Sequence, residues 1–431
     1  MHNTAAMAFR LALAAAALLG TFGGVPAAHA APISSHAMVY SCCTPPELAE
    51  RIFAEAAATG SEYVRVDVQM TDVFEKEGGR LVEEPDWNGL DRMTELARRH
   101  RLKVLGILLN PPSWLTSCPA RFPHHVRCPA ADATEFGRLA GEIAAHAGAA
   151  VDHWEILNEP DGDWAFEGSP EEYARMLVAA RAGIAARAPE DRIVLGGMMS
   201  PHEREWLERL LAVPGAAQSF DIANVHLRGS VAGVIKRYLE VRARLVGHGF
   251  AGPVWVTEHG YAAEPAFQSD PSYRGGDDAQ AHYLTQSLVG LGEAGAEQIF
   301  VTLRDQGTGA YATEGLARIS ETPGYEVQRR PAFAAVQRVA LNWDQLLAWR
   351  ADQRRQEQLQ RISATAALLW RDQAMTGRQR LRQARLRGAP RLVARYRREL
   401  GWQRAVLAHY RLGTALYAAA AADLSARIAG P

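Results

Sequence analysis

The sequence has few cysteines, no glycine-rich nucleotide motif and, after residue 30, no apolar run of membrane-spanning length. Its four cysteines lack the Cys-x-x-Cys spacing of zinc sites, so we expect no metal. No glycine-rich turn follows the first predicted strand, which argues against a nucleotide-binding open sheet. The remainder is globular in composition, with 48% hydrophobic and 22% charged residues and a net charge of −1.

The N-terminus has the pattern of a secretory signal. Arg10 provides a positive charge, Leu11–Leu19 is a short apolar run, and Ala28–Ala30 offers a small-x-small cleavage site. We therefore predict a signal peptide over residues 1–30 and a secreted or extracytoplasmic protein, in the periplasm or at the cell surface. An uncleaved membrane anchor is the alternative.

The four cysteines fall into two pairs. Cys118 and Cys128 flank one loop, and in an oxidising compartment we expect them to form a disulfide. Cys42 and Cys43 are adjacent, which fits either a vicinal disulfide or two thiols. Neither directly follows the proposed cleavage site, which argues against a lipoprotein.

Short apolar runs alternate with helical patterns from about residue 36 onwards. Eight such runs predict strands, which are His36–Ser41, Glu62–Val68, Lys103–Leu109, the run that begins at Trp154, Arg192–Met198, Asp221–His226, Pro253–Glu258 and Gln298–Arg304. Helices between them include Pro46–Thr59, Asp86–His100 and Ser169–Arg187. This alternation predicts an α/β fold, a (β/α)8 TIM barrel over residues 31–342, with a doubly wound open sheet as the alternative.

The last part of the chain, residues 343–431, differs in character. It is predicted to be helical and contains no Lys, and Gln345–Pro431 holds 17 Arg against five Asp and Glu. Breaks at Gly377, at Gly388–Pro390 and at Gly413 predict an Arg-rich appendage of two to four helices.

This charge suggests a partner for the appendage. Arg-rich helices bind anionic polymers, so a polymer of the cell envelope is one expected partner. A solvated helical hairpin resting on the acidic barrel is the other interpretation. The region has no strand pattern interleaved with aromatic residues, and we expect no nucleic-acid binding.

Two carboxylates, Glu159 and Glu258, each follow an apolar strand. In a TIM barrel such strand ends meet at one mouth, and there they would join Arg65, Asn158, His226 and Arg304. Hydrolysis of a glycosidic bond needs a proton donor and a second carboxylate. A separation of about 5–5.5 Å makes the second group a nucleophile, whereas about 6.5–9.5 Å admits a water between them.

Several motifs resemble retaining glycoside hydrolases of the (β/α)8-barrel clan, above all family 39 and cellulase-like enzymes related to family 5. The resemblance covers about residues 36–341. The motifs that carry it are Asn158-Glu159-Pro160, Thr257-Glu258, Tyr63–Val68, Pro111–Trp114, Asp278–Leu284, Gly315-Leu316 and Arg330–Phe333.

The resemblance implies roles for individual residues. Glu159 would be the general acid/base and Glu258 the nucleophile, without a metal or an organic cofactor. Asn158 would hold the sugar 2-hydroxyl, and Arg65 would keep Glu258 ionised. His226 would line the site between the two glutamates.

Three aromatic residues, Trp114, Trp164 and Tyr261, are candidates for stacking on sugars, and packing at the rim is the alternative for each. The chain also departs from the family, because Arg228 stands where an aromatic residue is usual and Arg304 stands near the usual position of a Trp. These two arginines would suit an acidic sugar or pair with Asp305 or Glu314. A glycan-binding barrel without activity, tethered by its basic tail, is the alternative function.

Overall fold

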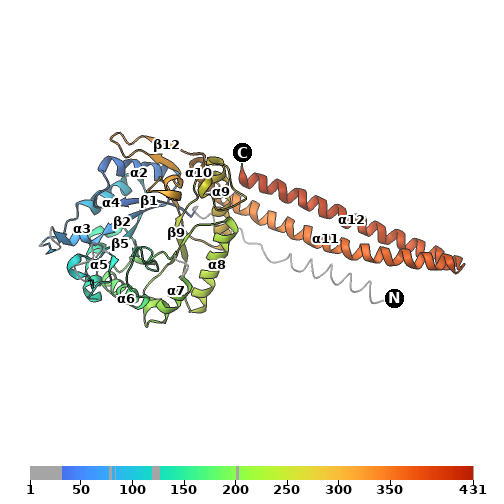
Figure 1. Cartoon of the computed structure of the whole chain (residues 1–431), viewed down its shortest axis with the longest axis horizontal. Helices are drawn as coiled ribbons and strands as arrows, with labels where there is room; N and C mark the ends of the chain where they lie inside the picture. The colour runs from blue at the N-terminus through green and yellow to red at the C-terminus, as the bar shows by residue number, and fades with distance from the viewer. Residues whose placement is uncertain (1–31, 77–79, 83, 119–126, 200–202, 431) are drawn as a thin grey trace. The chain divides into compact units, whose positions relative to one another are not determined.

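The computed structural model describes residues 32–76, 80–82, 84–118, 127–199 and 203–430. Its central feature is a parallel eight-stranded sheet in the order β7-β6-β5-β2-β1-β10-β9-β8 (Figure 1). The strands are β1 (Ile33–Tyr40), β2 (Tyr63–Gln69), β5 (Lys103–Leu109), β6 (His153–Ile156), β7 (Arg192–Leu195), β8 (Ala223–Leu227), β9 (Val254–His259) and β10 (Ile299–Thr302). Parallel bridges Val194–Ile222 and Met198–Val225 join the two edges and close the barrel. The predicted TIM barrel is confirmed.

Helices surround the sheet, and their ends follow local signals in the sequence. They are α2 (Pro46–Ala58), α3 (Met70–Phe74), α4 (Asn88–His100), α5 (Ala133–Ala147), α6 (Pro170–Arg187), α7 (Glu203–Ala212), α8 (Val231–Gly247), α9 (Asp277–Ala294) and α10 (Pro331–Leu341). Asp132 caps α5 by accepting from two backbone N–H groups, and Ser169 and Glu172 form a capping box on α6. Two short hairpins, β3–β4 (Glu75–Lys76, Arg80–Leu81) and β11–β12 (Ala317–Ile319, Val327–Arg329), lie outside the barrel sheet.

The barrel interior is layered because alternate side chains of each strand point inward. The lower layer is apolar and aromatic, and consists of Tyr63, Leu105, Val194, Ile222, Trp255 and Phe300. The positions two residues after Tyr63, Ile222, Trp255 and Phe300 are polar, namely Arg65, Asn224, Thr257 and Thr302, and all four are buried. The strand period therefore places a buried polar layer directly above an aromatic floor.

The C-terminal region consists of two long helices, α11 (Trp343–Leu386) and α12 (Pro390–Ala429), joined by a tight turn. The predicted breaks at Gly377 and Gly413 are wrong, because both glycines lie inside a helix. Gly377 faces α12, where a Cβ would meet Gln403 Oε1, at the end of a flexible side chain.

The base of this hairpin contacts the outer helices of the barrel. The ring of Trp343 packs on Gly292 of α9. Arg350 and Arg354 pair with Glu293 at 3.3 and 2.6 Å. The end of α12 is held by Arg338 of α10, which donates to the Ala429 carbonyl at 2.7 Å.

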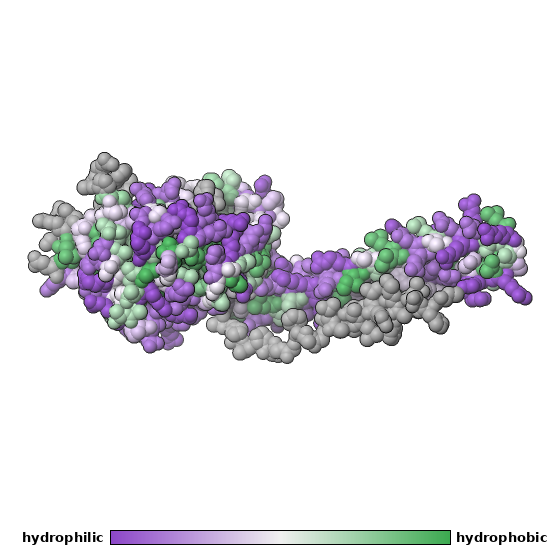
Figure 2. Space-filling view, turned by 90° about the horizontal axis from the view of Figure 1, so that it is seen from below, coloured by the Kyte–Doolittle hydropathy of each residue, from purple (hydrophilic) through white to green (hydrophobic). Residues whose placement is uncertain are grey.

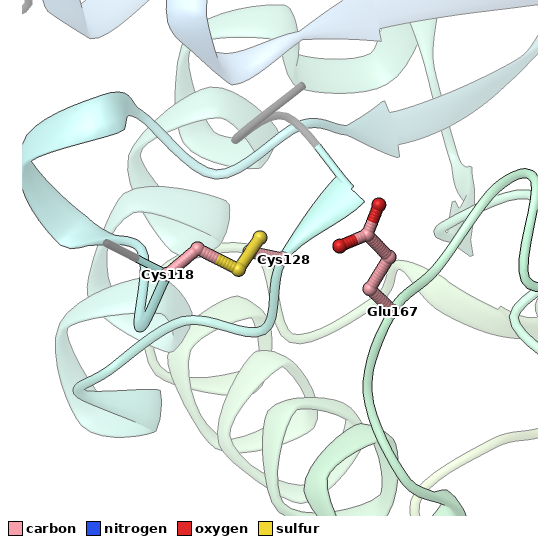
Figure 3. A group of neighbouring side chains, drawn as sticks. All are labelled: Cys118, Cys128 and Glu167. Atoms are coloured by element: carbon pink, nitrogen blue, oxygen red, sulfur yellow. A yellow bond between two sulfur atoms is a disulfide. The ribbon is translucent and has the colours of Figure 1, made fainter. Parts of the chain in front are cut away.

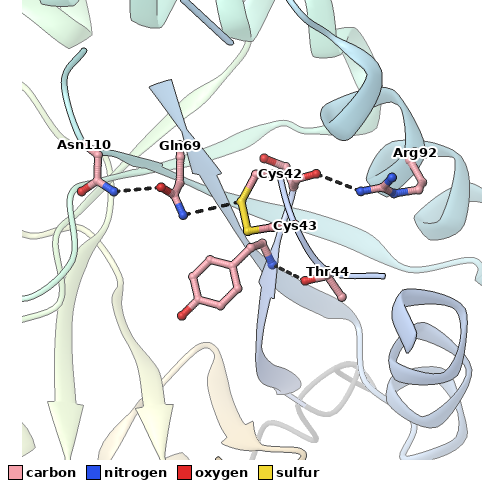
Figure 4. Close-up of a disulfide and its surroundings, with 8 residues drawn as sticks. Cys42, Cys43, Thr44, Gln69, Arg92 and Asn110 are labelled. Atoms are coloured by element: carbon pink, nitrogen blue, oxygen red, sulfur yellow. Dashed lines mark hydrogen bonds between the residues drawn. A yellow bond between two sulfur atoms is a disulfide. The ribbon is translucent and has the colours of Figure 1, made fainter. Parts of the chain in front are cut away.

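Two disulfides are present among the described residues. Cys118 is joined to Cys128 beside Glu167 (Figure 3). The adjacent Cys42 and Cys43 are joined just after β1, and Gln69 Nε2 lies 3.8 Å from the Cys42 sulfur (Figure 4).

The predicted signal peptide, residues 1–30, lies outside the described residues. Within them, no helix is both long enough and apolar enough to cross a membrane.

Candidate active site

Glu258 lies near the end of β9 and accepts hydrogen bonds from two arginines. Its Oε1 accepts from Arg65 Nη1 at 2.8 Å, and its Oε2 accepts from Arg228 Nη1 at 3.2 Å. His36 Nε2 lies 3.7 Å from Oε1. Burial by itself would raise the pKa of Glu258, but His226, His36, Arg65 and Arg228 together hold that pKa well below its usual range. Glu258 is therefore a carboxylate that stays ionised.

Arg65 is held by the barrel wall rather than presented to a ligand. Its Nε and Nη2 donate to both oxygens of Glu155 at 2.9 Å, and Nη2 also donates to Asn158 Oδ1 at 2.7 Å. Because Arg65 and Glu155 are both buried, the ion pair fixes the guanidinium that contacts Glu258. Arg65 is thus a positioning residue, held by the fully buried Glu155.

Glu159 follows β6 in a segment of unusual backbone conformation. Leu157 and Glu159 have φ values of 59° and 46°, which point successive side chains away from the regular strand direction. The Glu159 side chain is buried. Its Oε2 accepts from Trp164 Nε1 at 2.7 Å, and its Oε1 lies 2.8 Å from His226 Nδ1.

The two carboxylates face one another across His226. Oxygens of Glu159 and Glu258 and a ring nitrogen of His226 all lie within 4.8 Å of one another. A water molecule held between two carboxyl groups needs a wider gap, of about 6.5–9.5 Å. The spacing therefore suits a nucleophile and an acid/base on one sugar.

His226 connects Glu159 to a buried network of hydrogen bonds that includes Asn224, Thr257 and Glu155. Asn224 is oriented by the Thr257 N–H, which donates to Oδ1 at 3.1 Å, and by Glu155, which accepts from Nδ2 at 3.0 Å. The Thr257 hydroxyl donates to that same Oδ1 at 3.0 Å.

Asn224 Nδ2 also donates to the Thr257 hydroxyl oxygen at 2.7 Å, and His226 Nε2 lies 3.0 Å from that oxygen. Thr257 therefore fixes the orientation of the His226 ring, whose Nδ1 contacts Glu159 at 2.8 Å.

Arg228 resolves one alternative left open by the sequence. It donates to both oxygens of Glu314, at 2.9 and 3.0 Å, and its guanidinium lies over the Tyr311 ring at 5.0 Å. Its charge is thus shared between Glu258 and Glu314 and is not free for an acidic sugar. Sequence reasoning proposed this pairing as one option but assigned Glu314 no role in the site.

The predicted sugar-stacking residues have different positions. Trp164 is 47% exposed and donates to the carboxyl of Glu159, so its ring is open to solvent beside that group. Trp114 is half-buried against the core and donates to the Phe74 carbonyl at 3.3 Å, which is the rim packing named as its alternative. Tyr261 is buried and stacked on Tyr283 at 3.8 Å, so its assignment as a stacking surface is wrong.

Arg304 is also directed away from the two glutamates. Its Nε donates to the Ala37 carbonyl at 3.0 Å, and among the described residues it makes no hydrogen bond to either Glu159 or Glu258. Its predicted partner Asp305 instead pairs with Arg330 at 2.7 Å. Burial lowers the pKa of Arg304, which fits a side chain held in the wall.

Two buried groups near Glu258 were missed by the sequence reasoning. His36 accepts from Arg65 at Nδ1, 3.2 Å away, and burial lowers its pKa to about 3, so it is neutral. Asp67 lies two residues after Arg65 on the same strand face, and burial raises its pKa to about 7. Alternate residues of a strand share a face, so the sequence pattern that placed Arg65 inside the barrel could also have placed Asp67 there.

The chain resembles known proteins in its three-dimensional structure. No protein-family model and no curated protein matches the chain. A family 39 glycoside hydrolase from Bacteroides cellulosilyticus is similar at 16% identity and a TM-score of 0.53, over 70% of this chain and 63% of its own. This chain therefore spans less than two thirds of that enzyme's length. It has the fold of glycoside hydrolases.

Two further structures share this barrel. A glucosidase from Croceicoccus marinus is 15% identical with a TM-score of 0.52, covering 74% of this chain and 69% of its own. A family 5 subfamily 18 enzyme from Streptomyces cattleya, solved with Manβ1-4GlcNAc, is 15% identical with a TM-score of 0.51, covering 72% and 81%. The resemblance inferred from the motifs is confirmed at the level of the fold.

Proposed function

We propose that this chain is a secreted retaining glycosidase that hydrolyses O-glycosidic bonds of an oligo- or polysaccharide. The observation that carries the proposal is the close approach of the Glu159 and Glu258 carboxylates, within 4.8 Å and bridged by His226. This separation is slightly shorter than the roughly 5–5.5 Å of enzymes that form a covalent intermediate, and much shorter than the roughly 6.5–9.5 Å that admits a water.

In the first step Glu258 attacks the anomeric carbon. The bond to the leaving oxygen breaks, and that oxygen takes the proton of Glu159. In the second step Glu159, now a carboxylate, removes a proton from water while the water oxygen displaces Glu258 from the anomeric carbon. Two inversions leave the product with the starting configuration.

The different surroundings of the two glutamates support this division of roles. Arg65 and Arg228 donate to Glu258 and keep it ionised, as a nucleophile must be. Glu159 instead contacts the indole of Trp164 and the imidazole of His226, and no arginine donates to it among the described residues. A carboxyl without a nearby arginine is better suited to hold and release a proton.

Substrate contacts are proposed for a smaller set than the sequence suggested. Trp164 offers an exposed ring beside Glu159. Asn158 lies between Arg65 and the mouth, with Oδ1 engaged by Arg65 and Nδ2 making no hydrogen bond to a described residue, so this amide could meet a sugar hydroxyl.

Hydrolysis of a panel of glycans, followed by NMR of the first-formed anomer, tests the proposal. The similar structures include a glucosidase and an exo-β-1,4-mannosidase, so glucosides and mannosides head the panel. A first product of inverted configuration would refute the retaining mechanism.

The second candidate is a glycan-binding barrel without activity, tethered by its basic helices to an anionic polymer of the envelope. The high exposure of Trp164 favours glycan binding in either case. Glycan binding without any hydrolysis by the purified protein would favour this candidate. For helices α11 and α12, the distribution of arginines along the hairpin supports a more specific proposal for the binding partner.

A further inference from the structure

The turn of the α11–α12 hairpin carries a dense positive charge. Residues 373–398 contain nine arginines and no Asp, Glu or Lys, and these arginines are Arg378, Arg380, Arg382, Arg385, Arg387, Arg391, Arg395, Arg397 and Arg398. All nine are exposed. Those nearest the turn, Arg385, Arg387 and Arg391, form no ion pair with a described residue. The hairpin therefore concentrates its charge at one end.

Apolar side chains are exposed at the same turn. Leu386 is 79% exposed, the highest value among the large apolar residues described, and Leu392 is 40% exposed. The two leucines flank Arg387 and Arg391 in sequence. Figure 2 shows apolar atoms among hydrophilic ones at this end of the hairpin. Leu386 and Leu392 therefore place exposed apolar surface directly beside the exposed arginines of the turn.

The turn is also far along the helices from the contacts that anchor them. The last described ion pair to α9 on this side is that of Arg354, and Leu386 lies 32 residues later, about 48 Å along the helix axis. Between these points α11 packs on α12 through Ala374, Leu381 and Leu400, with Trp370 against Trp402 at 5.0 Å. This length holds the turn away from the α9 contacts.

We propose that this turn, residues 385–392, docks on an anionic phospholipid surface. Arginine guanidinium groups form paired hydrogen bonds with phosphate oxygens, and each basic residue near an anionic membrane adds to binding. Leu386 and Leu392 insert between the headgroups, as apolar side chains of membrane-surface helices do. A soluble anionic polymer would use the arginines alone and gives the leucines no partner.

Vesicle sedimentation with the full chain tests the proposal. The protein is mixed with vesicles of phosphatidylcholine, with or without about one third phosphatidylglycerol. Binding is expected only with phosphatidylglycerol, and it should weaken as salt is added.

Two variants separate charge from insertion. The triple variant Arg385→Gln, Arg387→Gln, Arg391→Gln should reduce partitioning about 100-fold. The double variant Leu386→Ser, Leu392→Ser keeps the charge and should reduce it about 10-fold. The control, Leu412→Ser with Leu416→Ser, changes two leucines of α12 that are both 60% exposed and should bind like the original protein.

The outcomes decide between partners, and circular dichroism checks that each variant keeps its helices. Absence of binding to phosphatidylglycerol vesicles overturns the proposal. So does unchanged binding of the leucine variant combined with competition by a soluble polyanion, which would assign the turn to an anionic polymer. The proposal is independent of hydrolysis, which all three variants should retain.

Discussion

The two glutamates of the barrel mouth have the same chemical group in opposite surroundings. Glu258 accepts hydrogen bonds from two arginines, one at each oxygen. Glu159 contacts an indole and an imidazole. The barrel brings the two carboxyl groups together, and only Glu258 then has arginines beside it, which is the difference that the proposed roles of nucleophile and proton donor need.

The largest loss of activity is expected from removing the carboxylate of Glu258. Glu258→Gln keeps the size of the side chain but removes the nucleophile, so kcat should fall by at least about 10⁴-fold. Steady-state kinetics on the best glycan of the panel measures this loss. Retention of full activity would show that Glu258 is not the nucleophile.

The loss of activity on removing the proposed proton donor, Glu159, should depend on the substrate. Glu159→Ala should reduce kcat/KM about 10²–10⁴-fold on natural glycans, because their leaving groups need protonation. Aryl glycosides with good leaving groups should lose much less in the first step. Azide added to this variant should restore turnover and give a glycosyl azide of retained configuration, whereas an inverted azide would contradict the assignment.

The second arginine can be removed while Arg65 remains. Arg228→Met takes one cation from Glu258, so the pKa of Glu258 should rise and the acid limb of the kcat/KM profile should move to higher pH. The sign follows because the nucleophile works ionised, and activity is lost as the pH falls through that pKa. Near the acid limb we expect a loss of about 10-fold, which corresponds to about 1.4 kcal/mol.

This variant leaves Glu314 buried without its partner, which would destabilise the fold by about 3–5 kcal/mol. The control variant Arg228→Met with Glu314→Gln removes both charges. The shift of the acid limb should persist in this control, and an unshifted profile there would exclude an effect of Arg228 on Glu258.

The smallest effect on activity is expected at Trp164. Trp164→Ala removes both the exposed ring and its hydrogen bond to Glu159, and should raise KM about 10-fold. Trp164→Phe keeps a ring and loses only the hydrogen bond, so KM should stay near its original value and kcat should fall a few-fold. Equal KM values in the two variants would argue against stacking of a sugar on Trp164.

The barrel was predictable because its signals are local. Each strand is a short apolar run, and each glutamate directly follows or ends one, so sequence order and strand period were enough to place Glu159, Glu258 and Glu155. Arg65 was likewise expected beside Glu258, and the distance of 2.8 Å bears this out.

The remaining contacts depend on chain segments that are distant in sequence. Glu314 lies in a loop 86 residues from Arg228, and no local pattern marks it as a partner. Tyr261 follows a strand end as a binding residue would, but Tyr283 of α9 covers its ring. In the hairpin, Gly377 and Gly413 look like helix breaks in the sequence, but packing of α11 against α12 keeps both glycines within a helix.

The backbone at Glu159 has a consequence for the stability of the fold. A residue with a side chain pays about 1–2 kcal/mol to adopt a φ of 46°, whereas glycine does not. Glu159→Gly should therefore unfold at a higher temperature than Glu159→Ala, by several degrees in a thermal melt, although both lack the proton donor. The reverse order would show that Ala relaxes the segment. If the expected order holds, Glu159 occupies a position where glycine would make the protein more thermally stable.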